Sequence, residues 1–385
     1  MDDLLLRELT PAVIGVLTRR GLDFASAEDA VQEALIQATR TWPNEMPADP
    51  KGWLVTVAWR KFLDGHRSEE ARRAREFRTW AEPPPGPTEN TDDTLQLFFL
   101  CAHPLLSPSS AVALTLRAVA GLTTKQIAEA YLVPESTMAQ RISRAKRAVR
   151  DVRFEEHGDL STVRRVLYLV FNEGYTGDVD LASEAIRLTR QLTVLSDDEE
   201  TSGLLALMLL HQARRSARTR LDGSLIPLAE QDRSQWDTIL VAEGVDILQA
   251  ALARDRLGEY QVQAAIAALH ADAQCVEETD WVQIVSWYDE LVRITGSAVV
   301  QLNRAVAVGE ADGAAAGLAE LAAVDRSVPR YAAVSAHLHE KAGDLHTAAR
   351  LYVEAAGLAS SLAERHHLTR RAARIGQQRP GITEA

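Results

Sequence analysis

Apolar residues recur at helical spacing along nearly the whole chain. In the segment SAEDAVQEALIQATRTW they form one stripe with steps of three and four, made of Ala30, Val31, Ala34, Leu35 and Ala38. No segment combines the strict alternation of a strand with the turn residues of a hairpin. The pattern therefore predicts an all-α protein.

One break divides this helical pattern. The segment WAEPPPGPTENTDD has clustered prolines and acidic residues, which cannot continue a helix or build a core. We expect a Pro-rich acidic linker over residues 76–93, between one helical domain at 1–75 and a second at 94–153. The spacing of apolar residues over 154–385 predicts stacked helical pairs, such as the two helices that meet at Gly343-Asp344.

The stripe starting at SAEDAV also predicts a polar face. Ser26 is the expected N-cap, with Asp29 three residues later in a capping-box arrangement. The stripe leaves Asp29, Gln32 and Glu33 on other faces of the helix, so spacing alone predicts a solvated acidic face.

The helix WLVTVAWRKFLDGHR follows a loop with three prolines. Its spacing turns Leu54, Val57 and Ala58 inward. Its flank presents Trp53, Thr56, Arg60 and Lys61. Residues 51–75 contain seven basic and three acidic residues, a patch of the size that contacts phosphates, although an ordinary solvated helix face has a similar composition.

The segment TTKQIAEAYLVPESTMAQRISRAKR predicts a helix-turn-helix. Gly121 closes the preceding helix, and Thr123 caps the next one with Gln126 at the third position. Pro134 disfavours helix at the residue before it, so the turn falls there and the second helix begins near Glu135.

That second helix has two contrasting faces. Its narrow apolar seam consists of Met138, Ile142, Ala145 and Val149. The opposite side presents Ser136, Gln140, Ser143, Arg144 and Arg147, with Arg141 on the shoulder. Arg, Gln and Ser suit base edges and phosphates. A basic amphipathic helix can also face only solvent or a protein partner, but cap, turn and seam together favour DNA binding.

Charge is distributed unevenly between the two parts of the chain. The formal net charge is -12, yet the first 153 residues hold 20 basic and 20 acidic residues, so the acidic excess lies beyond them. An acidic surface repels the DNA backbone, which favours a protein-binding role for residues 154–385. With 46% apolar residues, no long apolar run and an acidic N-terminus, we expect a cytoplasmic protein with no membrane contact.

Catalysis and metal binding find no support in the residue pattern. The two cysteines, Cys101 and Cys275, are far apart and have no histidine at ligand spacing, so we expect two buried core thiols and no metal. Without a nucleophile-base spacing or a phosphate-binding Gly loop, we expect no cofactor and no enzymatic activity.

Taken together, SAEDAVQEALIQATRTW, DPKGWLVTVAWRKFLD and GLTTKQIAEAYLVPESTMAQRISRAKR resemble regions 2 and 4 of an extracytoplasmic-function (ECF) sigma factor of the bacterial sigma-70 family. The extension resembles that of the subgroup with a long C-terminal tetratricopeptide (TPR)-like domain, the group forty-two type. Many ECF factors have Leu-Gly before the turn, where this chain has Tyr131-Leu132.

The resemblance implies a subunit that binds the β′ clamp and β flap of core RNA polymerase, together with promoter DNA. The residues matching the polymerase-binding helix are Asp29, Gln32 and Glu33. Those matching the -10 element surface are Asn44, Lys51, Trp53, Thr56, Arg60, Lys61 and Arg67. Those matching the -35 reading helix are Ser136, Thr137, Gln140, Arg141, Arg144 and Arg147.

Polar clusters in the extension allow two interpretations. The residues are Asn172, Glu173, Tyr175, Asp232, Arg233, Trp236, Asp280, Trp281, Asn303 and Arg304. Helix capping and buried networks that hold the repeats in register account for them best. Our hypothesis is that the extension regulates the sigma regions, by docking on them or on polymerase. The alternative is a helix-turn-helix activator with a ligand- or peptide-sensing TPR-like domain.

Overall fold

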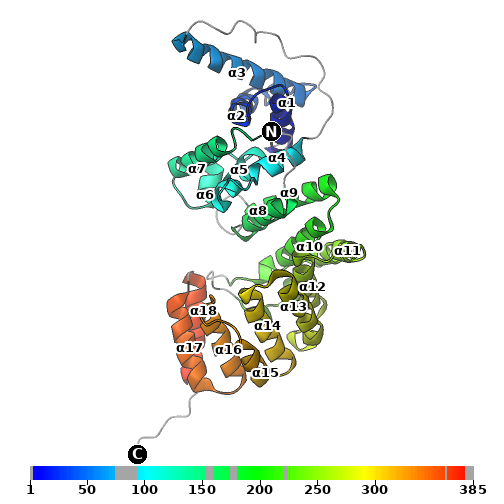
Figure 1. The fold of residues 1–385 in the computed structure, drawn as a ribbon, viewed down its shortest axis with the longest axis vertical. Helices are drawn as coiled ribbons and strands as arrows, with labels where there is room; N and C mark the ends of the chain where they lie inside the picture. The colour runs from blue at the N-terminus through cyan, green and yellow to red at the C-terminus, as the bar shows by residue number, and fades with distance from the viewer. Residues whose placement is uncertain are drawn as a thin grey trace, which may run out of the picture. The chain divides into compact units, whose positions relative to one another are not determined.

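The computed structural model describes residues 3–73, 93–152, 159–173, 180–220, 224, 226–359 and 362–377. Within those residues the chain forms 18 α-helices and no strand, which confirms the predicted all-α fold (Figure 1). The helices belong to two compact units, residues 1–197 and 198–385. The predicted linker lies outside the described residues, apart from its last residue, Asp93.

The first unit consists of the helices up to Asp197. They are α1 (Asp3–Arg19), α2 (Phe24–Thr41), α3 (Pro50–Arg73), α4 (Thr94–Cys101), α5 (Pro108–Ala118), α6 (Thr124–Ala130), α7 (Glu135–Ala148), α8 (Leu160–Glu173) and α9 (Leu181–Ser196). Helices α1, α2 and α3 pack together, and α5 packs against α4, α6 and α7.

Helix α2 buries the stripe that the sequence predicted. Its members Ala30, Val31, Ala34, Leu35 and Ala38 are all at most 9% exposed. The predicted cap was wrong, because α2 begins three residues earlier than expected. The carboxylate of Asp23 accepts hydrogen bonds from the N–H groups of Ala25 and Ser26, which makes Asp23 the N-cap.

The predicted helix-turn-helix corresponds to α6, a turn and α7. Thr123 and Gln126 form the capping box that the sequence indicated. At the turn, the N–H of Val133 donates to the carbonyl of Ala128 over 3.0 Å. Gly121 has φ +70°, and a Cβ there would lie 3.0 Å from the Cα of Arg7 in α1, so glycine allows α1 to approach closely.

Helices α8 and α9 follow the predicted end of the second sigma region at residue 153, yet they belong to the first unit. They pack against each other, α8 contacts α4 and α5, and α9 contacts α4. The Arg7 guanidinium of α1 lies 3.9 Å from the Glu184 carboxylate of α9. The first two helices after the sigma regions are therefore part of one packed body with them, while the functional domain limits stay a prediction.

The second unit consists of successive antiparallel helical pairs. Its α-helices are α10 (Glu199–Ala213), α11 (Thr238–Leu252), α12 (Glu259–Asp272), α13 (Trp281–Thr295), α14 (Ala298–Ala311), α15 (Ala314–Leu321), α16 (Tyr331–Lys341), α17 (Leu345–Leu358) and α18 (Leu362–Gln377). The 3-10 turns are η1 (Arg215–Ala217), η2 (Leu228–Glu230), η3 (Arg233–Gln235) and η4 (Val276–Glu278). Gly343, at φ +81°, joins α16 to α17 where the sequence predicted the junction.

The two cysteines differ in their surroundings. Cys101 is buried in α4 as expected, and burial, followed by the charge of Glu28, raises the pKa of its thiol. The expectation of a second core thiol was wrong: Cys275 is exposed, because it lies in the short connection between α12 and η4. Among the described residues, no helix has the length and apolar character needed to cross a membrane.

Leu132 gives a direct test of the turn geometry. It has φ +51°, the left-handed conformation that costs an L-residue about 1 kcal/mol and that glycine adopts freely, and its side chain is 77% exposed. Glycine also adds freedom to the unfolded chain, so we expect the calorimetric unfolding transition of the first unit in the full chain to be about 2–4 °C higher for Leu132→Gly than for a Leu→Gly change at an unstrained position.

Leu105→Gly is the matched control, since Leu105 is also an exposed leucine but has no positive φ. There the substitution only adds freedom to the unfolded chain, so the same transition should fall. An equal decrease for Leu132→Gly and Leu105→Gly would show that the turn carries no backbone strain.

Candidate functional site

Helix α7 separates a buried seam from an exposed polar face. Met138, Ile142, Ala145 and Val149 are at most 4% exposed, which confirms the predicted seam. The predicted DNA-contacting residues Ser136, Thr137, Gln140, Arg144 and Arg147 are all exposed, and Arg141 is half-buried. The seam fixes the rotation of the helix, and this rotation presents the polar side chains to solvent.

The arginines on this face are held only by their own helix. The Nε atoms of Arg144 and Arg147 donate to the carbonyls of Gln140 and Ser143, both over 3.4 Å. Within the described part of the chain neither guanidinium has an ion-pair partner. Such groups can fork to guanine or to phosphate without first breaking an ion pair.

The residues predicted to touch the -10 element lie on α3 and in the loop before it. Leu54, Val57 and Ala58 are buried as predicted. The outer side chains are half-buried at Lys51, Trp53, Thr56 and Lys61 and exposed at Asn44 and Arg60. The side chain of Arg67 lies outside the described residues.

Two contacts orient this surface. The Trp53 ring meets the Trp42 ring edge-on, with centroids 5.5 Å apart, which holds the indole beside the loop. The hydroxyl of Thr56 donates to the Gly52 carbonyl over 2.8 Å. A half-buried indole next to cationic side chains is a platform on which an unpaired base can stack.

The predicted acidic face of α2 is only partly solvated. The carboxylates of Asp29 and Glu33 are 72% and 61% exposed. The expectation was wrong for Gln32, which is 9% exposed and whose side-chain nitrogen has no hydrogen-bond partner. The role of these three residues in polymerase binding stays a prediction.

A buried charge cluster in the same unit escaped the sequence analysis. The Glu28 carboxylate has no exposed surface, and its Oε1 lies 2.8 Å from Nε of Arg117 in α5. Lys146 of α7 contacts the other carboxylate oxygen of Glu28 and donates to Oδ1 of Asp29 over 2.6 Å. The sequence does show that Glu28 lies on the apolar face of the helix, three residues before Val31. Its two cationic partners are about ninety and 120 residues away, so helical spacing could not identify them.

A second buried carboxylate lies at the start of α4. Asp93 is 5% exposed, and its Oδ2 lies 2.9 Å from Nε of Arg19 at the end of α1. A Cβ on Gly15 would lie 2.5 Å from the Asp93 Cβ, so this glycine leaves room for the carboxylate. Asp93 is the last residue of the predicted linker, yet it is part of the packed first unit.

In the second unit, several candidate residues cap helices or bind carbonyl groups. Asp232 and Asp280 are the N-caps of η3 and α13, accepting from the N–H groups of Ser234 and Gln283. Arg233 donates from one nitrogen to the carbonyls of His270 and Ala273, over 2.7 and 2.5 Å. These contacts favour the capping interpretation over a ligand site.

Trp236 and Trp281 lie in packed surroundings. Trp236 is 6% exposed, and the guanidinium carbons of Arg214 and Arg233 lie 5.7 and 5.3 Å from its ring centroid. Trp281 meets the His270 ring edge-on at 5.3 Å. Burial and the nearby arginines lower the pKa of His270 to about 4, so this histidine is neutral at pH 7.

The remaining candidates differ in their exposure. Arg304 of α14 pairs with Asp289 of α13 over 2.6 Å and with Glu320 of α15 over 2.5 Å, joining three helices. Asn172 and Asn303 are exposed. The side chain of Glu173 and the whole of Tyr175 lie outside the described residues.

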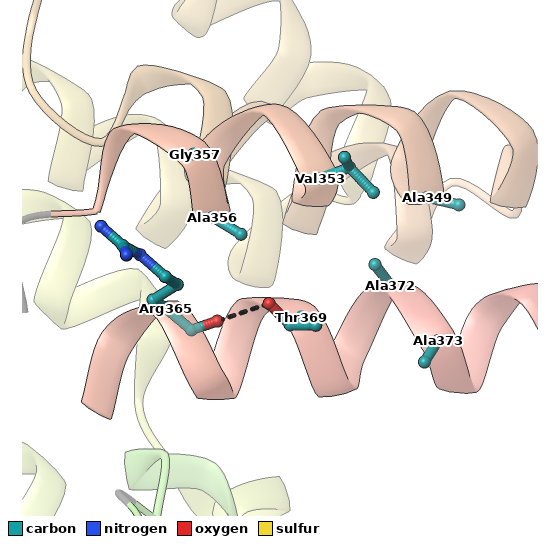
Figure 2. Close-up of a pocket in the computed structure, with 8 residues that line it drawn as sticks. All are labelled: Ala349, Val353, Ala356, Gly357, Arg365, Thr369, Ala372 and Ala373. Atoms are coloured by element: carbon teal, nitrogen blue, oxygen red, sulfur yellow. Dashed lines mark hydrogen bonds between the residues drawn. The ribbon is translucent and has the colours of Figure 1, made fainter. Parts of the chain in front are cut away.

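The second unit also contains an apolar cavity of about 690 Å³ between α17 and α18. Figure 2 shows that its walls are mostly small side chains, with Arg365 and Thr369 as the polar members. The Thr369 hydroxyl already donates to the Arg365 carbonyl over 2.8 Å. In the described part of the chain, no group of three His, Cys, Asp or Glu side chains is placed to bind a metal ion. The cavity wall is therefore mainly apolar.

Family comparisons assign three segments of the chain. Residues 5–73 match the model of sigma-70 region 2, and residues 99–149 match the model of sigma-70, region 4. Residues 159–252 match a family of unknown function, DUF6596. The first match covers α2 and α3, the second covers the helix-turn-helix, and the third begins at α8 and continues into the second unit.

Curated relatives of the chain include named ECF sigma factors. The chain is 39% identical over 351 residues to an uncharacterized protein, R00370, of Rhizobium meliloti, covering 82% of this chain and 81% of the relative. It is 28% identical to the probable ECF RNA polymerase sigma factor SigI of Mycobacterium tuberculosis, covering 43% and 59%. With the ECF RNA polymerase sigma factor SigJ of that species it shares 32% identity, covering 32% and 42%. No solved structure matches the chain.

Arg233 tests the capping interpretation of the extension. Arg233→Met leaves the two carbonyls at the end of α12 without their donor, which should cost about 2 kcal/mol. We expect amide hydrogen exchange in residues 268–283 of the full chain to speed up about thirtyfold. Arg256→Met is the control, because Arg256 is 78% exposed and pairs loosely with Glu199. Unchanged amide exchange in Arg233→Met would show that Arg233 does not stabilise the end of α12.

Proposed function

This chain belongs to the ECF branch of the bacterial sigma-70 family and acts as a sigma factor in transcription initiation, and we propose that its two sigma regions divide the promoter between them. Sigma factors are not enzymes; they bind core RNA polymerase and promoter DNA. Here α7 takes the -35 element, while α3 and the loop before it take the -10 element.

The observation that carries this proposal is the two-faced geometry of α7. Its seam is at most 4% exposed, whereas Gln140, Arg144 and Arg147 extend from the other side. A helix fixed by a buried seam at the end of a helix-turn-helix is the element that enters a major groove. The exposed arginines supply both base contacts and phosphate contacts there.

The -10 surface rests on a different kind of chemistry. Trp53 offers an indole for stacking, and Arg60 and Lys61 supply cations for the displaced strand. Lys61 also lies 3.9 Å from Glu33 on α2, so the DNA-facing and polymerase-facing surfaces adjoin. An activator that only binds duplex DNA is not favoured, because it would have no use for a complete region 2.

We further propose that the C-terminal helices regulate the sigma regions. What supports this is the packing of α8 and α9 against α4 and α5, with Arg7 of α1 beside Glu184 of α9. The acidic excess of residues 154–385 favours contact with basic protein surfaces over contact with DNA. A change in the second unit could then reach region 4 through helices that already touch it.

The sigma role is tested with purified sigma-free bacterial core polymerase. The full chain should associate with it and start transcription at specific sites; failure to associate would reject the sigma role.

Arg144 separates promoter recognition from polymerase binding. Arg144→Ala should lower initiation about tenfold at promoters that rely on a -35 element, because one forked contact is lost. Polymerase binding should not change.

The control is Arg293→Ala, which removes an exposed arginine paired with Glu290 within α13 of the second unit. Its transcription should equal that of the unmodified chain. Equal loss of polymerase binding and initiation in Arg144→Ala would mean that α7 serves the fold instead of reading DNA.

Two truncations test regulation by the extension. A chain of residues 1–197 keeps α8 and α9, and a chain of residues 1–153 removes them. We expect promoter-dependent transcription by the 1–197 chain to differ from that of the full chain by at least about fivefold, the usual size of coupling between sites. Comparing transcription by the 1–153 and 1–197 chains then shows the contribution of α8 and α9. Equal transcription by all three chains, at equal helical content, would contradict regulation.

A further inference from the structure

Helices α17 and α18 each turn one continuous face toward the cavity of about 690 Å³ that lies between them (Figure 2). On both helices the lining residues recur at steps of four and three, which places them on one side of the helix. They include Ala349, Val353 and Ala356 of α17, and Arg365, Thr369 and Ala372 of α18. This surface is called the α17–α18 groove below.

The groove is a second apolar face, separate from the core that these helices already share. Tyr352 and Ala355 of α17 and Leu368 and Ile375 of α18 are buried in a cluster that also includes residues of α16. A helix that is apolar only toward its own core needs no further neighbour. These two helices have buried one face each and still present another.

The groove is open to solvent and has room for large side chains. Val353 is 64% exposed, and a Cβ added at Gly357 would meet nothing within 4 Å. Among the described helices, those that pack closely on α17 are α16 and α18. An exposed outer face of a helical stack is ordinarily polar, because solvent covers it. This one is mostly Ala, Gly and Val, which favours a further helix as its cover.

The charges of the two helices are opposite in sign to the acidic excess of residues 154–385. Together α17 and α18 carry five arginines and two acidic residues. The exposed arginines are Arg350, Arg365, Arg370 and Arg374. Of the two acids, Glu354 is exposed, whereas Glu364 is 19% exposed and pairs with Arg330. The exposed surface of this helical pair is therefore positive.

Arg365 brings this charge into the groove itself. Its guanidinium donates one hydrogen bond to the Ala359 carbonyl, over 3.3 Å, and the side chain is exposed. A guanidinium has five N–H donors, so a carboxylate can still bind there. A second copy of the chain would instead bring like charges together, because each copy presents the same arginines. Charge therefore favours an acidic partner over self-association.

The shape of the groove indicates which side chains it accepts. Small residues on both walls let another helix approach closely and leave space for large apolar side chains between them. Helix α17 has 14 residues and is about 21 Å long, which corresponds to about four turns of a docked helix. Large residues at i, i+4, i+7 and i+11 of such a helix would all lie over the groove.

We propose that the α17–α18 groove docks an amphipathic helix of another protein, with large apolar side chains on one face and Asp or Glu along both flanks. The apolar side chains fill the groove, and the flanking carboxylates pair with Arg365 and the other exposed arginines. This binding site does not depend on the sigma function of the first unit, and failure of either leaves the other standing.

The test uses the full chain and two fluorescent synthetic peptides. Both have four turns held helical by a hydrocarbon crosslink and carry Leu at i, i+4, i+7 and i+11. One has Glu at every flanking position, and the other has Lys there. By fluorescence anisotropy the Glu peptide should bind at least about tenfold more tightly than the Lys peptide, and added salt should weaken its binding. Absence of saturable binding by the Glu peptide, or equal binding of the two peptides, would overturn the proposal.

Val353→Glu places the site at the groove. A carboxylate there removes an apolar contact and repels the Glu peptide, so affinity should fall at least about tenfold. Val282→Glu is the matched control, since Val282 of α13 is also an exposed valine, at 70%, and lies outside the groove. Its affinity should equal that of the unmodified chain. Equal weakening in both variants would mean that net charge alone decides binding, which contradicts the groove.

Circular dichroism shows whether Val353→Glu keeps its helices. If helical content falls, Gly357→Leu takes its place, because it fills the groove at a position where a side chain meets no other atom. Unchanged affinity in the folded variant would overturn the proposal.

Two further outcomes would assign the groove to this chain itself. Light scattering should give the mass of one chain for the unmodified protein; a dimer that Val353→Glu converts to monomers would make the groove a self-interface. The chain ending at Gln377 should bind the Glu peptide as the full chain does. Clearly tighter binding by the shorter chain would mean that residues 378–385 occupy the groove, and either result overturns docking of another protein.

Discussion

The burial of the Glu28 carboxylate constrains how the helices of the first unit pack. An ion removed from water is tolerated only where opposite charges and hydrogen bonds replace its hydration. The two cations that do so come from α5 and α7, so satisfying one side chain of α2 brings three helices from two sigma regions together. Breaking such a buried pair from one side costs about 3–5 kcal/mol, a large share of the stability of an ordinary domain.

Charge pairs play a comparable role in the second unit, where they connect successive helical pairs. Arg304 joins α13, α14 and α15 through Asp289 and Glu320. Glu310 of α14 accepts from His337 and Lys341 of α16, and these hydrogen bonds lower the pKa of Glu310 to about 2. The charge pairs of Arg304 and Glu310 therefore connect neighbouring helices of the second unit.

Predictions from the sequence succeeded where one helix decides the outcome and failed where a distant segment decides it. The capping box of Thr123 and the seam of α7 depend on residues a few positions apart, and both were confirmed. The cap of α2 was misplaced because Asp23 and Ser26 are both good caps, and only the start of the helix chooses between them. Gln32 and Cys275 were misjudged because their burial depends on neighbouring elements.

The sequence by itself determined the all-α fold, the two faces of α7 and the family, because each depends on local spacing or on motif order. Tertiary structure alone decided that Glu28 is buried, that Lys146 serves α2, and that α8 and α9 pack with the sigma regions. A carboxylate on an apolar stripe can lie at the solvated edge of the stripe or be a buried ion. Which of these it becomes depends on cations that lie far away in the chain and are brought close only by folding.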